Sequence, residues 1–386
     1  MINFISNLPS GLRSGGFSAM NAAAFDALST LEEIDYVGPI APPPFIAEKV
    51  RSKALRICGA RGDFFFFSPR RLRRIADAVR SRCRADARLD FFHGFTPWIL
   101  TEPSRPYVAW SDCTFRDYID IYHRREQFRS DDLERIERME AEWLSRAQCI
   151  AFTSRWAARR AIEHYGLRES AVYCVGIFGE AELPEGDRYA GRNQFAFVAT
   201  NFVAKGGSAA LAAFKRVRER HPDASLVVVG AKPLDAGAEA NVTYAGYLKK
   251  EVGRENETFR EILTQSRALV HPTGADIAPL IVVEAGYFGC PAISVRKFAI
   301  PELIEHQVSG LMVDDSTNVV ALAEAMNWMI EQKTDYMRMR EQTWRKARTE
   351  HSKQAFEQRM RAAIRTALGE PVAKPSEAPR VAFERR

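Results

Sequence analysis

Short apolar runs alternate with amphipathic stretches along most of the chain. The runs "FAFVA" and "SLVVVG" flank "SAALAAFKRVRERH", in which Leu211, Phe214 and Val217 share one helical face. Apolar runs continue to "GLMV" and also occur, less regularly, from "INFIS" to "AVYCVG" in the first half. Strands that alternate with helices predict parallel sheets covered on both faces. Helical patterns lie at about 17–29, 45–57, 69–84, 131–147, 155–165, 208–221, 256–266, 279–289, 301–306 and 318–331.

The chain of 386 residues is long enough for two domains, since one domain usually takes about 100–200 residues. We expect an α/β fold with two doubly wound, Rossmann-like domains, at residues 1–178 and 195–350. The polar segment 179–194, with its Pro and Gly, is predicted to be a linker. A helix at 351–368 is expected to pack back toward the N-terminal domain, and 369–386 has the composition of a disordered tail.

The net charge of +6 is compatible with nucleic acid, anionic lipid or a phosphorylated substrate. Much of the excess lies in the arginine-rich helix at 69–84, for which a solvated helix face is favoured over a membrane-surface patch. A nucleic-acid role would rest on charge alone and is not expected. No apolar run reaches the roughly 20 residues that span a bilayer, and no secretory signal is evident. We therefore expect a cytoplasmic protein, with peripheral contact at the inner face of the membrane as an option.

The six cysteines lack metal-ligand spacing, so neither a zinc site nor a disulfide framework is expected.

One carboxylate stands inside the apolar stretch "ADIAPLIVVEAGYFGCPAISV". Glu284 lies eight positions after Asp276, and Pro279 between them is typical of a helix start. A buried carboxylate needs either a protein partner or a polar ligand. Arg296 is an available partner, whereas two carboxylates at one sheet edge are suited to binding sugar hydroxyls.

The loop "TNFVAKGGS" joins a predicted strand to a predicted helix. Its glycines allow close backbone approach at Gly206, the helix start offers free N–H groups, and Lys205 adds a positive charge. This combination predicts an anion site at the sheet edge, although a strand–Gly–helix turn is also common without any ligand.

Taken in order, "KGG", "YAGYLKKE", "HPTGADIAPLIVVEAGYFGCPAISV" and "IPELIEHQVSGLMV" resemble the donor half of retaining GT-B glycosyltransferases of family 4. The resemblance implies two Rossmann-like domains that face each other across a cleft. It also implies that Glu284 holds the ribose hydroxyls of a nucleotide and that Lys205 neutralises the leaving diphosphate. The family has a pair of glutamates, and Asp276 replaces the first of them, as in a bacterial subset, and would face the donor sugar.

The resemblance assigns further donor contacts. Thr200 stands where the family usually has an Arg, and Lys249 or Lys250 is the candidate replacement for that cation. The remaining residues implied to bind the donor, through backbone groups or at the base, are Gly206, Ile277, Ala278, Pro279, Leu280, Tyr247 and Leu248.

The N-terminal half carries a weaker resemblance to the same family. In "SGLRSGGFSAM", Gly15 and Gly16 would approach the donor phosphates and the acceptor. Asp112 in "YVAWSDCTFRDY" follows a strand where many relatives have a His near the donor sugar, which implies a catalytic and acceptor-binding role. The alternative for Asp112 is a helix N-cap. His93 is a second strand-end candidate for the acceptor, with a structural role as its alternative.

The resulting hypothesis is a retaining glycosyltransferase in which Lys205, Asp112 and Asp276 are the catalytic candidates. The expected substrates are a nucleotide-diphosphate sugar, UDP- or GDP-linked, and an acceptor that is a glycan, a lipid-linked sugar, a small molecule or a protein. No cofactor and no metal is expected. The expected role is bacterial glycan or glycoconjugate synthesis. The alternatives are a sugar-nucleotide epimerase of GT-B fold and a catalytically weak sugar-nucleotide-binding protein, the latter favoured by Thr200 and Asp276.

Overall fold

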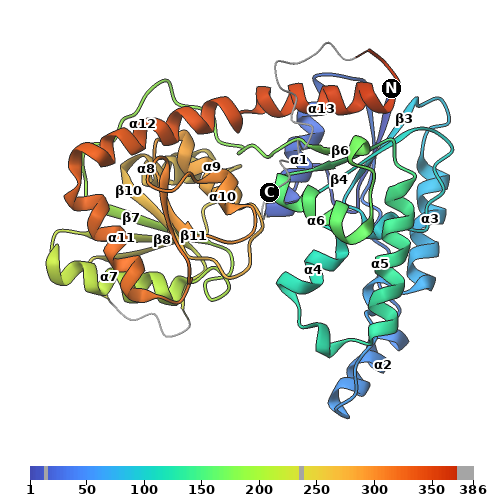
Figure 1. Cartoon of the computed structure of the whole chain (residues 1–386), viewed down its shortest axis with the longest axis horizontal. Helices are drawn as coiled ribbons and strands as arrows, with labels where there is room; N and C mark the ends of the chain where they lie inside the picture. Colours follow the sequence, from blue (N-terminus) through green and yellow to red (C-terminus); the bar gives the residue numbers. More distant parts are fainter. Residues whose placement is uncertain (13–15, 234–238, 372–386) are drawn as a thin grey trace. The chain divides into compact units, whose positions relative to one another are not determined.

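The computed structural model describes residues 1–12, 16–233 and 239–371, which fold into two compact α/β units (Figure 1). The first unit contains residues 1–12, 17–176 and 356–371 of the part that the structure describes. The second is built mainly from residues 177–355. Each unit has its own parallel sheet, so each is described by itself.

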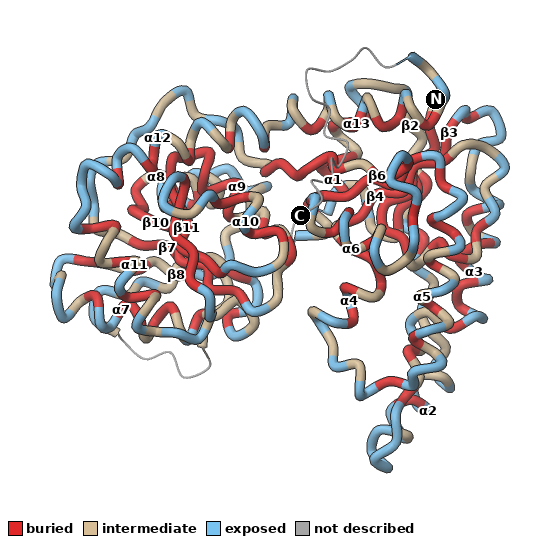
Figure 2. The backbone as a smooth tube through the Cα atoms, in the orientation of Figure 1, coloured by how far each residue is buried: buried red, intermediate tan, exposed pale blue. Residues whose placement is uncertain are grey.

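A six-stranded parallel sheet forms the centre of the first unit. Its strand order is β2 (Ile34–Val37), β1 (Ile2–Ile5), β3 (Leu89–His93), β4 (Tyr107–Ser111), β5 (Cys149–Phe152) and β6 (Val172–Cys174). Every residue of β1, β3, β4 and β5 is buried, as the red strands in Figure 2 show. These runs are mostly apolar because helices cover both faces of a parallel sheet. The buried polar exceptions are Asn3, Asp90, His93 and Ser111.

The helices of the first unit follow the strands in sequence. They are α1 (Gly16–Ser29), α2 (Ile46–Ile57), α3 (Pro69–Arg82), α4 (Phe115–Tyr122), α5 (Ser130–Ser145) and α6 (Arg155–Tyr165). The short 3-10 helix η2 (Thr96–Trp98) follows β3. From Phe356 onward, α13 (Lys353–Ala367) belongs to this unit, where the Phe356 ring lies 5.6 Å from that of Trp110.

The second unit repeats the plan with another six-stranded parallel sheet. Its order is β12 (Gly310–Val313), β11 (Ala292–Val295), β10 (Ser266–His271), β7 (Gln194–Ala199), β8 (Ser225–Gly230) and β9 (Val242–Gly246). Its helices are α7 (Gly207–Arg220), α8 (Gly253–Gln265), α9 (Leu280–Tyr287), α10 (Ile300–Leu303), α11 (Val319–Glu331) and α12 (Lys333–Glu350).

Both sheets contain a point where the direction of winding reverses. The chain runs from β7 outward through β8 and β9 and then returns to the other side of β7 as β10, so the loops after β7 and β10 leave the sheet side by side. In the first sheet the corresponding neighbours are β1 and β3. In doubly wound folds, ligands bind at the carboxyl ends of the strands at this point.

The predicted α/β fold class with two Rossmann-like domains is confirmed, but two helices were not predicted. Helix α4 begins after Thr114, whose side chain caps it by accepting from the N–H of Asp117 at 3.3 Å. Helix α12 was missed because "KTDYMRMREQTWRKARTE" is dominated by charged residues. Its buried positions, Tyr336, Met339, Arg340, Thr343 and Ala347, nevertheless follow helical spacing.

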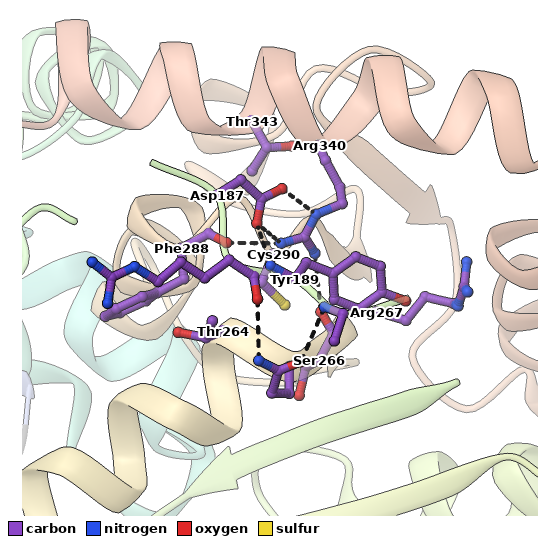
Figure 3. A network of polar contacts seen from close by, with 12 residues as sticks. Asp187, Tyr189, Thr264, Ser266, Arg267, Phe288, Cys290, Arg340 and Thr343 are labelled. Atoms are coloured by element: carbon purple, nitrogen blue, oxygen red, sulfur yellow. Dashed lines mark hydrogen bonds and ion pairs between the residues drawn. The ribbon is translucent and has the colours of Figure 1, made fainter. Parts of the chain in front are cut away.

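The polar segment at 179–194 is anchored to the second unit through a buried guanidinium. Arg340, on α12, makes two hydrogen bonds to the carboxylate of Asp187, at 2.8 and 2.7 Å, and one to the carbonyl oxygen of Phe288 at 2.9 Å (Figure 3). The same guanidinium lies over the ring of Tyr189. Composition alone predicts a linker here, whereas the contacts tie this segment to α12 and to the end of α9.

Candidate functional site

The loops after β7 and β10 meet at the carboxyl edge of the second sheet. The N–H of Gly274 donates to the carbonyl oxygen of Ala204 at 3.3 Å, which joins the two loops. Gly206 has a φ of +78°, and a Cβ at this position would lie 2.1 Å from the carbonyl oxygen of Pro272. Only glycine fits such a contact. The two loops can approach each other this closely only because position 206 is a glycine. Helix α7 begins directly after it, at Gly207.

An ion pair between Lys205 and Asp276 also joins these two loops. Its Nζ donates to Oδ2 of Asp276 at 2.6 Å and to the carbonyl oxygen of Ala275 at 2.8 Å. Both side chains of the ion pair keep some solvent exposure. The loop "TNFVAKGGS", predicted as an anion site, and Asp276 thus form one cluster. Its ammonium group lies at the edge of the sheet where α7 begins.

Asp276 has a second partner that sequence reasoning missed. His271, the buried last residue of β10, places its Nε2 at 3.3 Å from Oδ2 of Asp276. Burial raises the pKa of the Asp276 carboxyl, but His271 and the Lys205 ammonium outweigh burial and hold the pKa below its ordinary value. Asp276 is therefore a carboxylate at neutral pH. A His at the end of a predicted strand, in "ALVHP", was the available signal.

Glu284 lies in the second turn of α9 and is only 2 % exposed. Its Oε1 accepts from Nζ of Lys250, which comes from the loop between β9 and α8, and from the N–H of Glu180 at 3.3 Å. Gly179 packs so closely that a Cβ there would meet the Glu284 side chain at 2.5 Å.

The partner considered for Glu284 from the sequence, Arg296, lies elsewhere. Its Nε contacts Oδ1 of Asp314 at 3.2 Å. Arg296 follows β11 and therefore pairs at the end of the neighbouring strand β12. Lys250 compensates the buried charge instead.

The other predicted donor contacts surround this cluster. The exposed Tyr247 donates from its hydroxyl to the carbonyl oxygen of Thr200 at 3.0 Å, so the loop carrying Leu248 lies against the end of β7. Ile277 is buried, and its carbonyl oxygen accepts from the N–H of Ala299 at 3.1 Å. Pro279 is the N-cap of α9, so the segment from Ala278 to Leu280 forms the start of that helix. A helix start presents N–H groups and a positive dipole end to a ligand.

The remaining candidates belong to the N-terminal half of the chain. Gly15 lies outside the described residues, and Gly16 begins α1. Asp112 follows β4 and accepts from the hydroxyl of Ser111 at 3.3 Å. The helix cap considered for Asp112 is provided by Thr114 instead, because α4 begins at Phe115.

His93 ends β3 and is completely buried among aromatic rings. Its ring centroid lies 4.3 Å from that of Phe17 and 5.3 Å from that of Trp110. Burial lowers the pKa of His93 to about 3, so the imidazole is neutral at physiological pH. Phe17 follows Gly16 directly, and this contact brings the start of α1 beside the end of β3.

A buried carboxyl that the sequence analysis did not single out supports this region. Glu140, on α5, accepts from the N–H of Phe115 at 2.6 Å, from the hydroxyl of Thr96 at 2.6 Å and from that of Tyr165 at 2.9 Å. It therefore links the segment after β3 to the start of α4. Burial raises the pKa of Glu140 to about 7, against the opposing effect of its hydrogen bonds. The signal was an acid on the apolar face of a predicted helix, four residues after Ile136.

The described residues were also compared with the requirements of a metal site and of a membrane-spanning helix. They contain no group of three or more His, Cys, Asp or Glu side chains placed to hold a metal ion. None of their helices has the length and apolar character that crossing a membrane requires.

Comparisons with known proteins give a family match for the second part of the chain. Residues 180–346 match the family described as glycosyl transferases group 1. No curated protein sequence matches the chain. The match covers most of the second unit, and it includes Lys205, Asp276 and Glu284.

Solved structures resemble most of the chain at low identity. A TarM variant of S. aureus in complex with fondaparinux, α-GlcNAc-glycerol and UDP is 10 % identical with a TM-score of 0.55, over 73 % of this chain and 55 % of TarM. HepE of Anabaena in complex with UDP and glucose is 14 % identical with a TM-score of 0.62, over 94 % and 98 %. Sucrose-phosphate synthase of Thermosynechococcus elongatus is 13 % identical with a TM-score of 0.68, over 95 % and 99 %.

These likenesses define the fold class. The chain has the GT-B fold, with two Rossmann-like domains, and it spans about half the length of TarM. Its second unit is the part that matches the glycosyl transferases group 1 family.

The raised pKa of Glu140 predicts a pH-dependent stability. Because the folded pKa of about 7 exceeds the ordinary 4.5, the stabilising contribution is complete below about pH 4.5 and is lost as pH rises through about 7. Between about pH 5 and pH 8 we expect wild type to lose on the order of 3 kcal/mol of unfolding free energy more than Glu140→Gln does. Urea unfolding followed by tryptophan fluorescence measures this difference.

Glu137→Gln is the matched control for this prediction, since Glu137 lies on the same helix and pairs with Arg125 at 2.6 Å nearer the surface. It should keep the pH slope of wild type. Equal slopes for wild type and Glu140→Gln would contradict the assignment of the titration to Glu140.

Proposed function

We propose that the protein is a retaining glycosyltransferase of family 4 that transfers a sugar from a nucleotide-diphosphate sugar to an acceptor hydroxyl. The observation that carries the proposal is the cluster at the edge of the second sheet, where Lys205, Asp276 and the buried Glu284 gather around the starts of α7 and α9. This cluster lies within the segment that matches the glycosyl transferases group 1 family.

The chemistry of the proposed donor fits the groups present. Glu284 would accept hydrogen bonds from the two ribose hydroxyls, and a buried carboxylate favours such ligands because it is poorly solvated. Asp276, kept ionised by His271 and Lys205, would accept from hydroxyls of the donor sugar. Gly206 and the start of α9 would hold the diphosphate through backbone N–H groups, with Tyr247 and Leu248 beside the base.

The proposed reaction breaks the bond between the anomeric carbon and the diphosphate oxygen and forms a bond to the acceptor oxygen. Negative charge develops on the departing diphosphate, and Lys205 with the helix starts would stabilise it. The departing phosphate would take the acceptor's proton, so no protein nucleophile is needed. Asp112 and His93, at the ends of β4 and β3, are proposed to contact the acceptor, with Gly16 nearby. The lowered pKa of His93 favours a positioning role for its neutral ring.

UDP is the first nucleotide to test and GDP the second. The TarM variant and the HepE structure both contain UDP, which supports UDP for this chain as a proposal. No metal and no cofactor is included in the proposed reaction. The acceptor class, a glycan, lipid-linked sugar, small molecule or protein, stays open, and the proposed setting is bacterial glycan or glycoconjugate synthesis.

Two alternative functions are considered beside the glycosyltransferase. Thr200 provides no cation beside Lys205, and Lys205 is itself paired with Asp276, which supports a sugar-nucleotide-binding protein with little turnover. A sugar-nucleotide epimerase of GT-B fold would use the same donor groups without an acceptor.

We also propose that the protein works in the cytoplasm, in contact with an anionic membrane surface through α2 and α3. Ile46, Val50 and Ile57 on α2 are 79 %, 60 % and 76 % exposed, and their spacing places them on one helical face. Arg70 and Arg74 on α3 contact the ring of Phe45, just before α2. Exposed apolar side chains beside cations are suited to a surface of anionic headgroups.

Nucleotide binding tests the proposed donor site. UDP at about a hundred times its dissociation constant should stabilise the protein by about 2.7 kcal/mol in thermal unfolding, and Glu284→Gln and Lys205→Met should each remove that stabilisation. GDP, ADP and dTDP are tested in parallel. Lys215→Met is the matched control, because Lys215 pairs with Glu239 at 3.1 Å and lies farther along α7. If no diphosphate stabilises wild type, the donor site is wrongly assigned.

The stereochemistry of slow donor hydrolysis separates the proposed enzyme classes. With a UDP-sugar and no acceptor, the sugar first released should have the anomeric configuration of the donor, as read by proton NMR before mutarotation. The inverted anomer would rule out retention. Conversion to an epimeric UDP-sugar would favour the epimerase, and tight binding without any turnover, even with a panel of acceptors, would favour the binding protein.

Membrane contact predicts sedimentation with vesicles. Wild type should sediment with vesicles of phosphatidylglycerol and phosphatidylcholine, and only weakly with phosphatidylcholine alone. Ile46→Ser combined with Ile57→Ser should lower the bound fraction severalfold. Met337→Ser, at an exposed apolar residue of the second unit, is the control that should bind as wild type does. Equal sedimentation of all variants would exclude α2 from the contact.

A further inference from the structure

The carboxylate assigned to the ribose is already occupied by a cation of the same chain. Glu284 is flanked on α9 by the buried Val283 and Ala285, so its charge has little access to water. An uncompensated carboxylate in such surroundings is costly. The Lys250 ammonium meets this need through its contact with Oε1.

Lys250 comes from a surface connection of the second unit. Its side chain is 27 % exposed, and it lies in the connection between β9 and α8, where Tyr247 and Val252 are also exposed. Its Nζ additionally lies 5.2 Å from the centre of the Phe259 ring on α8. The ion pair thus joins a buried acid on α9 to a partly exposed lysine on a surface loop.

The same loop touches the place where a diphosphate would lie. Tyr247, three residues before Lys250, donates to the carbonyl oxygen of Thr200 at 3.0 Å, and the loop after β7 leads from Thr200 to Lys205. A lysine released from Glu284 would therefore remain beside the edge that carries the anion loop. Lys249 differs, because its N–H donates to Oε2 of Glu255 at 2.6 Å and its side chain is exposed.

We propose that Lys250 is an internal ligand of Glu284 that is exchanged for the ribose hydroxyls when the donor binds, and that its freed ammonium then pairs with the diphosphate. This inference rests on the proposed function, because it takes Glu284 as the ribose carboxylate. A nucleoside alone would have to displace the ammonium without offering it a new anion. A nucleoside diphosphate supplies that anion in the same step, so Lys250 would select for ligands that carry phosphate.

The test compares a nucleoside with its diphosphate. The dissociation constants of uridine and UDP are measured by isothermal titration calorimetry. The constant of uridine divided by that of UDP states how much the diphosphate adds to affinity. In Lys250→Met, uridine should bind more tightly than it does to wild type, because its internal competitor is gone. UDP should lose the contribution of the ammonium, so the ratio should fall at least tenfold. If GDP is the diphosphate that binds, guanosine and GDP replace the pair.

Three further variants keep the interpretation specific. Lys250→Arg retains the charge and should keep most of the ratio. Lys215→Met should keep it entirely. Because Lys250→Met leaves a buried charge uncompensated, its melting temperature should fall without ligand, and adding Glu284→Gln should restore it.

The outcomes separate this inference from the proposed function. If wild type binds none of uridine, UDP, guanosine and GDP, the proposed function and the exchange of Lys250 are both contradicted. If wild type binds UDP but Lys250→Met shows an unchanged ratio, or weaker uridine binding, only the exchange is overturned. A change caused by Lys249→Met instead of Lys250→Met would also overturn it.

Discussion

The contact between Gly206 and the carbonyl oxygen of Pro272 is the constraint on which the site depends. It locks the loop after β7 against the loop after β10, at the point where the second sheet reverses its winding. Lys205 and Asp276 stand on either side of this contact, and their ion pair at 2.6 Å follows from it. A side chain at Gly206 would separate the loops and, with them, the two charges. The geometry of the site is therefore set by backbone packing before any charge is considered.

Charge compensation then distinguishes three acids of low exposure, Asp276, Glu284 and Glu140. Asp276 has His271 and Lys205 as partners, which keep its pKa low. Glu284 has one cation, the Lys250 ammonium, and the backbone N–H of Glu180. Glu140 has three neutral donors and no cation among them, so burial prevails and its pKa rises to about 7. A carboxylate with a lowered pKa, a carboxylate in a single ion pair and an acid with a raised pKa thus arise from the same kind of side chain in different surroundings.

The two units differ in how strongly they point to function. The second unit matches the glycosyl transferases group 1 family and contains the charged cluster. The strand ends of the first unit present a neutral, ring-packed His93 and the carboxylate of Asp112. In doubly wound folds ligands meet the carboxyl ends of the strands, so each unit presents its candidate residues at the same kind of edge.

Local pattern determined the elements of this protein. The twelve strands, six in each sheet, were predicted because each is a short apolar run bounded by polar or glycine-containing turns. The glycines of "KGG" and the acid at Glu284 were found for the same reason, since both break a local pattern. Helix α12 was missed because its buried residues are few and include Arg340, so charge concealed the helical spacing.

Only the tertiary structure decided which charges meet. Lys250 and not Arg296 compensates Glu284, His271 joins Asp276, and Glu140 bridges segments on three elements. Lys250 and Glu284, like Glu140 and its donors, come from separate loops and helices, so no spacing rule along the chain identifies these contacts. They follow from strand order and from the depth at which each side chain is buried, and both are properties of the folded sheet.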